Sequence, residues 1–302
     1  MYKFTPIRKT LVWGTEDWVI SGVPDNESVV AEGPEAGKKI TDIYPGQFPL
    51  LIKFIDTKQD LSVQVHPDDA LAQARYGLNG KTEMWYVIDA APGAKLISGL
   101  KKSITPDDYV RLVAEDRITD VLAEHTLAPG DVFFLPAGRI HAIGGGCFLT
   151  EIQQTSDLTY RIYDYNRLGL DGKPRQLHTQ EAKDAIDYRV YPEYRTKYEP
   201  CRDAAVQLVK CPHFTTELFE LTREMEIPGR AGNDKPAAGD KDFLILIGIA
   251  GQTRLRTERD ETVLSAGEAI LVPASDGALS ALPLAGEGSG CDGCVRFLTT
   301  HL

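Results

Sequence analysis

Four polar residues at strand positions of the sequence could together bind a metal ion. Gln64 and His66 stand two residues apart in SVQVHPDD, residues 62–69, so an extended backbone points both side chains to one face. Glu83 begins the apolar run EMWYVID, and His141 follows LPAGRI just past the end of another strand pattern. Two imidazoles, a carboxylate and an amide oxygen suit a divalent cation, with zinc as the expected ion. Fewer than six strong protein ligands leave positions for water or substrate, which favours catalysis over a purely structural site.

Each of these residues also has an ordinary structural explanation. A histidine after a strand is commonly a surface residue or a buried residue with a hydrogen-bonded ring, and a glutamate at a strand start is commonly solvated. A glutamine on a strand carries no information by itself. The metal-site hypothesis therefore depends on all four residues meeting at one place, which requires a fold that brings distant strands together.

Short strand patterns separated by glycine and proline make up most of the chain and predict an all-β protein. Six segments carry this pattern: LLIKFID, LSVQVH, EMWYVID, AKLISGL, DVFFLPA and CFLTEIQQ. Their spacing is typical of an antiparallel sandwich or barrel. The segment from about 105 to 125 differs, because Thr105 and Pro106 form a helix-start signal and apolar residues recur at helical spacing from Tyr109 to Leu122. We expect a small helical insertion there.

The last third of the chain contains a weak internal repeat. PGDVFFLPAGRIHAI, residues 129–143, resembles AGEAILVPASDGALS, residues 266–280, but Ala278 stands where the first copy has His141. This pattern predicts a duplicated β-barrel whose second copy has lost its polar site. We therefore expect a metal-binding catalytic domain over 1–195 and a degenerate domain over 196–302. RAGNDKPAAGDK, residues 230–241, is expected to be a flexible loop in the second copy.

The combination of motifs resembles a known enzyme family. SVQVHPDD, NGKTEMWY, PGDVFFLPAGRIHAI and EIQQTSDLTYRIYDYNR are arranged as in the type I mannose-6-phosphate isomerases, especially their short bacterial form, over roughly residues 1–190. The resemblance implies two cupin-type (jelly-roll) β-barrels, the first holding one metal ion per chain. It implies that zinc is bound by the matching residues Gln64, His66, Glu83 and His141, and that Arg161 is the active-site arginine.

The resemblance also implies a reaction, the interconversion of mannose 6-phosphate and fructose 6-phosphate through an enediolate. This is a step of mannose and carbohydrate metabolism. A metal ion would stabilise the oxyanion as a Lewis acid. Arg161 is a poor base, because its pKa lies above about 12, so we expect it to act by electrostatics or positioning. Longer family members read NHKPE where this chain has Asn79-Gly80-Lys81-Thr82-Glu83, so contacts of the missing histidine do not carry over.

Two further residues are candidates for substrate binding. Lys81 is two residues before Glu83 and shares its face on an extended backbone, where it could reach a sugar oxygen or the phosphate. Ser62 lies on the face of Gln64 and could donate its hydroxyl. The alternatives are a solvated lysine, an ordinary strand serine and, for Arg161, a structural ion pair with Asp164. His125 is expected at the end of the helical insertion, where a cation suits the helix C-terminus. His178, His213 and His301 lack partners at ligand spacing, so all four histidines are left out of the site.

Composition limits the partners of the protein. The chain of 302 residues has a formal charge of −11, which argues against a nucleic-acid or anionic-membrane surface. The small phosphorylated sugar that the resemblance implies as partner is an anion, so its site needs basic residues gathered locally against this charge. No apolar run approaches the roughly 20 residues of a membrane span, and the N-terminus has no signal-peptide pattern. Five scattered cysteines, including the pair Cys291 and Cys294, are expected to be reduced thiols of a cytoplasmic protein.

Two other functions remain open at this point. Two histidines and one carboxylate on a cupin barrel are also how non-haem iron oxygenases hold their metal. A non-catalytic, sugar-binding cupin is the other alternative. Lys81 and Arg161 favour a phosphorylated substrate, and Gln64 in place of a third histidine is unusual for an oxygenase. An intact first site beside a second copy without a site fits an enzyme better than a binding repeat.

Overall fold

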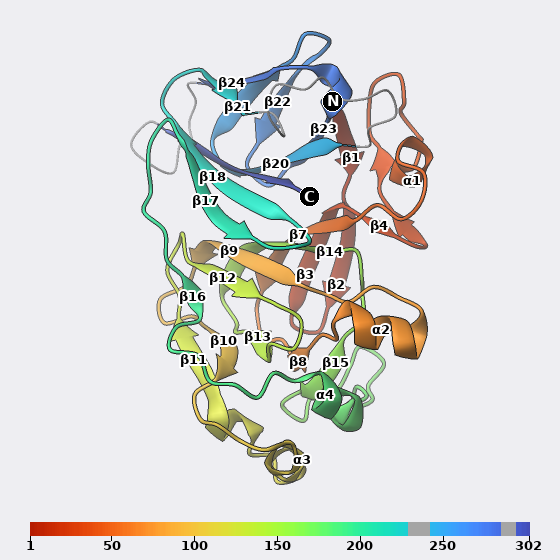
Figure 1. The fold of residues 1–302 in the computed structure, drawn as a ribbon, viewed down its shortest axis with the longest axis vertical. Coiled ribbons are helices and arrows are strands. Elements are labelled where there is room, and N and C mark those ends of the chain that lie inside the picture. Colours follow the sequence, from red (N-terminus) through yellow and green to blue (C-terminus); the bar gives the residue numbers. More distant parts are fainter. Residues whose placement is uncertain (229–241, 285–293) are drawn as a thin grey trace. The chain divides into compact units, whose positions relative to one another are not determined.

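The computed structural model describes residues 1–228, 242–284 and 294–302 (Figure 1). Strands form most of the regular structure of these residues, as the sequence predicts, and the helices are short. The helical elements are α1 (Ile40–Ile43), α2 (Asp69–Tyr76), α3 (Pro106–Ala114), α4 (Thr179–Ala185) and the 3-10 turns η1 (Ile118–Val121) and η2 (Ala274–Asp276). No helix of the described residues is long and apolar enough to span a bilayer.

The chain divides into two compact units. One consists of Pro6–Asn26 and Gln47–Thr196, and the other of Met1–Thr5, Glu27–Gly46 and Lys197–Leu302. The sequence predicts one domain over residues 1–195, whereas residues 1–5 and 27–46 belong to the unit that holds the C-terminal residues. The first residues differ from that expectation because β1 (Tyr2–Thr5) pairs with β23 (Ala269–Pro273) and with β6 (Val29–Val30). That the two units are a catalytic and a degenerate domain stays a prediction.

The first unit, which contains residues 6–26 and 47–196, holds two antiparallel sheets. In order across the larger sheet the strands are β16 (Arg195–Thr196), β12 (Val132–Leu135), β9 (Glu83–Ala90), β14 (Cys147–Gln154), β7 (Leu50–Thr57), β3 (Gly14–Ile20) and β2 (Ile7–Leu11). The smaller sheet runs β11 (Leu122–Thr126), β10 (Lys95–Leu100), β13 (His141–Ile143), β8 (Val63–Val65) and β15 (Tyr160–Tyr163). A two-stranded ribbon consists of β4 (Gly22–Val23) and β5 (Asn26–Glu27).

The other unit is built in the same way. Its larger sheet runs β17 (Ala205–Lys210), β18 (Thr215–Leu221), β25 (Val295–His301), β20 (Phe243–Ala250), β23, β1 and β6. Its smaller sheet runs β19 (Met225–Ile227), β24 (Leu279–Leu284), β21 (Gln252–Arg256) and β22 (Glu261–Ser265). Within the described residues none of these sheets closes on itself, so each unit is a pair of open sheets.

Apolar side chains from both sheets form the core of each unit. In the first unit Trp85 and Phe133 of the larger sheet pack with Leu96 and Ile143 of the smaller sheet. In the second, Leu246 of one sheet packs in a cluster with Leu255 of the other. All are buried. These apolar clusters therefore join the two sheets of each unit face to face.

The predicted helical insertion is shorter than expected. Thr105 caps α3, its side chain accepting the N–H of Asp108, while Pro106 occupies the first turn. The helical region ends with η1 at Val121 rather than near 125, because the next residues pair with β10 as strand β11. His125 therefore lies in a strand, not at a helix end, and its Nε2 is 3.2 Å from the carbonyl oxygen of Ser98.

The predicted loop at 230–241 lies outside the described residues.

The cysteines differ in part from the expectation of reduced thiols. Cys291 lies outside the described residues. Cys147, Cys201 and Cys211 are free thiols, as expected. Cys294 is disulfide-bonded, so the expectation of a reduced thiol is wrong for that residue.

Leu96→Ala should destabilise the unit that contains the predicted site by about 2–5 kcal/mol, because a fully buried side chain between two sheets leaves a cavity. Urea unfolding followed by tryptophan fluorescence measures the change. Leu170→Ala is the matched control, since Leu170 is 75% exposed and its truncation should change the unfolding free energy by less than about 0.5 kcal/mol. Equal effects of the two substitutions would contradict the assignment of this core.

Candidate metal centre

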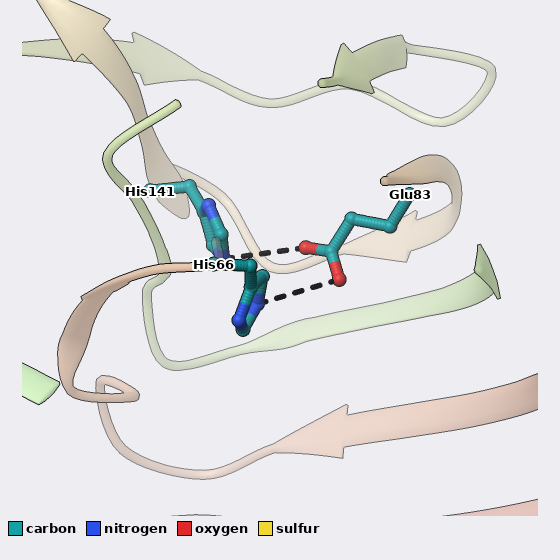
Figure 2. A group of neighbouring side chains, drawn as sticks. All are labelled: His66, Glu83 and His141. Carbon is teal, nitrogen blue, oxygen red and sulfur yellow. Dashed lines mark ion pairs between the residues drawn. The ribbon is translucent and has the colours of Figure 1, made fainter. Parts of the chain in front are cut away.

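Three of the predicted ligands meet between the two sheets of the first unit. His66 directly follows β8, Glu83 is the first residue of β9 and His141 the first of β13. One ligand atom from each residue lies within 4.8 Å of those of the others, and all three residues are buried. Figure 2 shows both imidazole rings directed at the two carboxylate oxygens of Glu83. The structure thus brings together side chains that are far apart in the sequence.

The local sequence explains how these residues reach one another. Pro67 has no N–H to donate to a neighbouring strand, so β8 ends at Val65 and His66 stands just beyond the end of the strand. Gly80 packs against the same segment, and a Cβ there would lie 2.5 Å from the backbone of Asp69. The backbone N–H of Lys81 then donates to the carbonyl of Pro67 at 3.1 Å. The glycine that replaces the histidine of NHKPE therefore permits a close approach that positions Lys81 and, two residues later, the carboxylate.

The two rings present their Nε2 atoms to the carboxylate. His141 Nε2 is 3.2 Å from Glu83 Oε1, and His66 Nε2 is 3.6 Å from Glu83 Oε2. On the other side of each ring, Nδ1 faces a backbone carbonyl, that of Leu158 at 2.7 Å for His66 and that of Arg139 at 2.8 Å for His141. A carbonyl only accepts, so each Nδ1 carries the proton and each Nε2 keeps a lone pair. This is the tautomer of a metal-binding histidine.

Within the described residues, four buried ligand atoms at this place make no hydrogen bond: Nε2 of both histidines and both carboxylate oxygens of Glu83. One of these oxygens, Oε2, forms an ion pair with the Lys81 ammonium at 3.2 Å. Buried polar atoms in folded proteins are normally satisfied, so four convergent unsatisfied acceptors fit a bound cation. The residues present therefore fit a divalent metal ion.

Burial controls the protonation of the three side chains. Burial, together with the nearby Lys81 ammonium, lowers the pKa of His141 to about 4 and the pKa of His66 well below its ordinary value. Both rings are therefore neutral at pH 7. Burial raises the pKa of Glu83 to about 7, and the negative charge of Glu151 contributes to the rise. The ionised Glu83 carboxylate is unfavourable in this buried place, and a cation bound to it and to the two neutral imidazoles would stabilise its charge.

Gln64 lies beside this group. In the register of the smaller sheet it is directly opposite His141 on one side and opposite Arg161 on the other. Residues directly opposite in an antiparallel pair project from the same face of the sheet, so the three side chains form a row. The register is consistent with Gln64 as a fourth ligand, and that role stays a prediction.

A cavity of about 200 Å³ lies in the same unit. The predicted substrate residues Ser62, Lys81 and Arg161 line it together with Gln64. Lys81 and Ser62 are buried, so the interpretation of Lys81 as a solvated surface lysine is wrong. The Lys81 ammonium is 3.2 Å from Glu83 Oε2, which places it between the cavity and the three-residue group.

Arg161 is not used in the ion pair that the sequence allowed. The carboxylate of Asp164 instead pairs with Arg167 at 2.8 Å and with Arg175 at 2.5 Å. The Arg161 guanidinium donates one hydrogen bond, to the carbonyl of Gln176 at 2.9 Å, and its Nε is buried without a partner. Burial and the charge of Arg175 lower the pKa of Arg161. A guanidinium held in this way retains donors for an anionic ligand.

Sequence reasoning missed five charged residues that line the cavity: Glu16, Lys53, Glu151, Asp157 and Arg175. Lys53 and Glu151 face each other across β7 and β14, with Nζ 2.9 Å from Oε1. Although burial alone would raise it, Lys53 lowers the pKa of Glu151 to about 2. The available signal was a lysine inside LLIKFID and a glutamate inside CFLTEIQQ, charges within apolar strands.

Comparisons with known proteins identify the family. Residues 15–92 match the protein family described as "Phosphomannose isomerase type I, catalytic domain". The chain is 31% identical over 300 residues to mannose-6-phosphate isomerase ManA of Bacillus subtilis, an alignment that spans 89% of this chain and 92% of the relative. The chain belongs to the mannose-6-phosphate isomerase family.

Solved structures of mannose-6-phosphate isomerases have the same fold. The crystal structure of the Bacillus subtilis enzyme superposes with a TM-score of 0.85 at 28% identity, covering 100% of this chain and 99% of that one. A zinc-bound mannose 6-phosphate isomerase superposes with a TM-score of 0.73 at 16% identity over 99% of this chain and 98% of that one, which supports the fold alone. The predicted family is thereby confirmed, and a mannose-6-phosphate isomerase fold surrounds the candidate metal centre.

Proposed function

We propose that this protein is a metal-dependent aldose–ketose isomerase that interconverts mannose 6-phosphate and fructose 6-phosphate. The observation that carries the proposal is the convergence of four buried ligand atoms of His66, Glu83 and His141, in the unit whose cavity is lined by Lys81 and Arg161 among other residues. The names of the relatives agree with this activity. We further propose that each unit is a cupin-type jelly roll built from two packed sheets, and that the first unit is catalytic.

The metal ion in this proposal is a single Zn²⁺ held by Gln64, His66, Glu83 and His141. Neutral imidazoles, a carboxylate and an amide oxygen suit zinc and leave a position for the substrate. When bound, the ion would supply Lewis-acid stabilisation of the sugar oxygens. Its charge would also offset the burial cost of the Glu83 carboxylate, whose pKa is about 7 without it.

The other residues of the cavity have distinct parts in the reaction. A proton leaves C2 of the open-chain aldose and is delivered to C1, while a hydroxyl proton passes from O2 to O1. Arg161, whose buried Nε lacks a partner, would stabilise the negative charge that develops on oxygen. Lys81 and Ser62 would hold the sugar or its phosphate by charge and hydrogen bonding.

The alternative functions are less well supported. Lys81 and Arg161 in the cavity suit a phosphorylated substrate, which an oxygenase does not require. The relatives are also named as isomerases. A non-catalytic sugar-binding cupin does not explain a family match to an isomerase catalytic domain. The cytoplasmic location expected from the cysteine content stays a prediction.

An isomerase assay tests the proposal. Purified protein is incubated with mannose 6-phosphate, and fructose 6-phosphate is followed by a coupled assay. We expect turnover that disappears after chelation and returns with added Zn²⁺, Mn²⁺ or Co²⁺, because the ion supplies several kcal/mol of charge stabilisation. No turnover with any of these metals would refute the isomerase function, and iron content with oxygen uptake would then test the oxygenase.

A further inference from the structure

The turn at residues 136–139 connects the two histidines of the proposed metal centre. Gly138 has φ = +88°, a left-handed conformation that glycine adopts without strain. Its N–H donates to the carbonyl of His66 at 2.9 Å. The next residue, Arg139, offers the carbonyl that accepts the Nδ1–H of His141 at 2.8 Å. The position of this one turn therefore determines where that ring is held.

The side chain of Arg139 is enclosed by two tyrosines from a distant part of the chain. Its guanidinium carbon lies 4.6 Å from the ring centroid of Tyr191 and 4.6 Å from that of Tyr194. Only 9% of Arg139 is exposed. A guanidinium between two aromatic faces is held by cation–π attraction on both sides. We call Arg139, Tyr191 and Tyr194 the tyrosine clamp.

Hydrogen bonds anchor the tyrosines of the clamp. The hydroxyl of Tyr194 donates to the carbonyl of Leu100 at 2.7 Å, and the hydroxyl of Tyr191 donates to the carboxylate of Asp187 at 2.7 Å. The N–H of Asp187 in turn donates to the carbonyl of Gly138 at 2.8 Å. The tyrosines are thus connected to the turn in two ways, through the stacked Arg139 side chain and through Asp187.

A glycine makes room for one of the rings. Gly99 has φ = +80°, and a Cβ on it would lie 2.1 Å from a ring carbon of Tyr194. Its N–H donates to the carbonyl of Ile140, the residue before His141. Tyr194 therefore packs directly beside the start of β13, where the metal-centre histidine is located.

We propose that the tyrosine clamp is a positioning device for the metal centre. It holds the Arg139 carbonyl so that His141 keeps its Nδ1–H tautomer and directs Nε2 toward Glu83 (Figure 2). No clamp residue lines the cavity beside Arg161, so all three are positioning residues rather than catalytic ones. The inference rests on the proposed metal centre and does not depend on which sugar phosphate is the substrate.

The affinity of the metal-free protein for Co²⁺, measured by visible absorption in competition with a chelator, tests the proposal. Arg139→Met and Tyr191→Leu should each weaken Co²⁺ binding about 10- to 100-fold, the usual effect of removing a group that orients a ligand. Tyr191→Phe keeps the ring and should retain affinity within about threefold. Arg117→Ala is the matched control: Arg117 is exposed and pairs with Asp120 at 3.0 Å, with no contact to the clamp in the described structure, and its loss should leave affinity unchanged.

A second readout separates positioning from general destabilisation. In ¹⁵N-labelled, metal-free protein, the ring nitrogen shifts of His141 should report the Nδ1–H tautomer in the wild type and Tyr191→Phe, and a mixture of tautomers in Tyr191→Leu. Wild-type affinity and an unmixed tautomer in both Arg139→Met and Tyr191→Leu would overturn the inference. Failure of the wild type itself to bind Co²⁺ would instead overturn the proposed metal centre before any variant is compared.

Discussion

Glu83→Gln should abolish stoichiometric metal binding and lower isomerase turnover about 10³-fold or more. Among His66, Glu83 and His141, the Glu83 carboxylate is the one negative charge. Its Oε1 is 3.2 Å from Nε2 of His141, and its Oε2 is 3.6 Å from Nε2 of His66. Glutamine keeps the shape but removes the charge that attracts a divalent ion into a buried site. Loss of a Lewis acid worth several kcal/mol corresponds to a rate loss of this size.

Metal content of the purified variant and initial rates with mannose 6-phosphate measure the effect. Glu124→Gln is the control, because Glu124 is half-exposed and pairs with Lys95 on the surface at 2.9 Å, so metal content and rate should not change. Circular dichroism of both variants checks that they fold. A Glu83→Gln protein that still binds one metal ion per chain would show that the ligand set is wrong.

Arg161→Lys should lower kcat/KM about 100-fold while leaving metal content intact. The guanidinium is partly buried, makes one hydrogen bond to the Gln176 carbonyl, and has a buried Nε–H without a partner in the described structure. Lysine keeps the charge, but it lacks the planar fork that can reach two oxygens of an anion. Removal of one such donor to a developing oxyanion usually costs 10²–10³-fold.

Arg195→Lys provides a matched comparison for this substitution. Arg195 also donates to one backbone carbonyl, that of Thr126 at 2.8 Å, but it is outside the residues that line the cavity. Its substitution should change kcat/KM by less than about twofold. If Arg161→Lys has an equally small effect, the proposed electrostatic role of Arg161 is refuted, whatever the metal content of the variant.

Local patterns in the sequence predicted the all-β fold and much of the candidate site. Alternation along a strand placed Ser62, Gln64 and His66 on one face, and the cap at Thr105 located the start of α3. These signals are short-range, because they depend on residues a few positions apart. Residue types at strand positions indicated the four candidate ligands, whereas Arg161 came from the resemblance to a family of known proteins.

Tertiary structure alone decided which charges share the cavity and how the metal-centre histidines are oriented. Lys53 and Glu151 are nearly one hundred positions apart and meet only through the register of β7 with β14. The tautomers of His66 and His141 depend on two backbone carbonyls, which have no sequence signature. Strand register and carbonyl direction are set by the packing of whole sheets, so local sequence does not contain them.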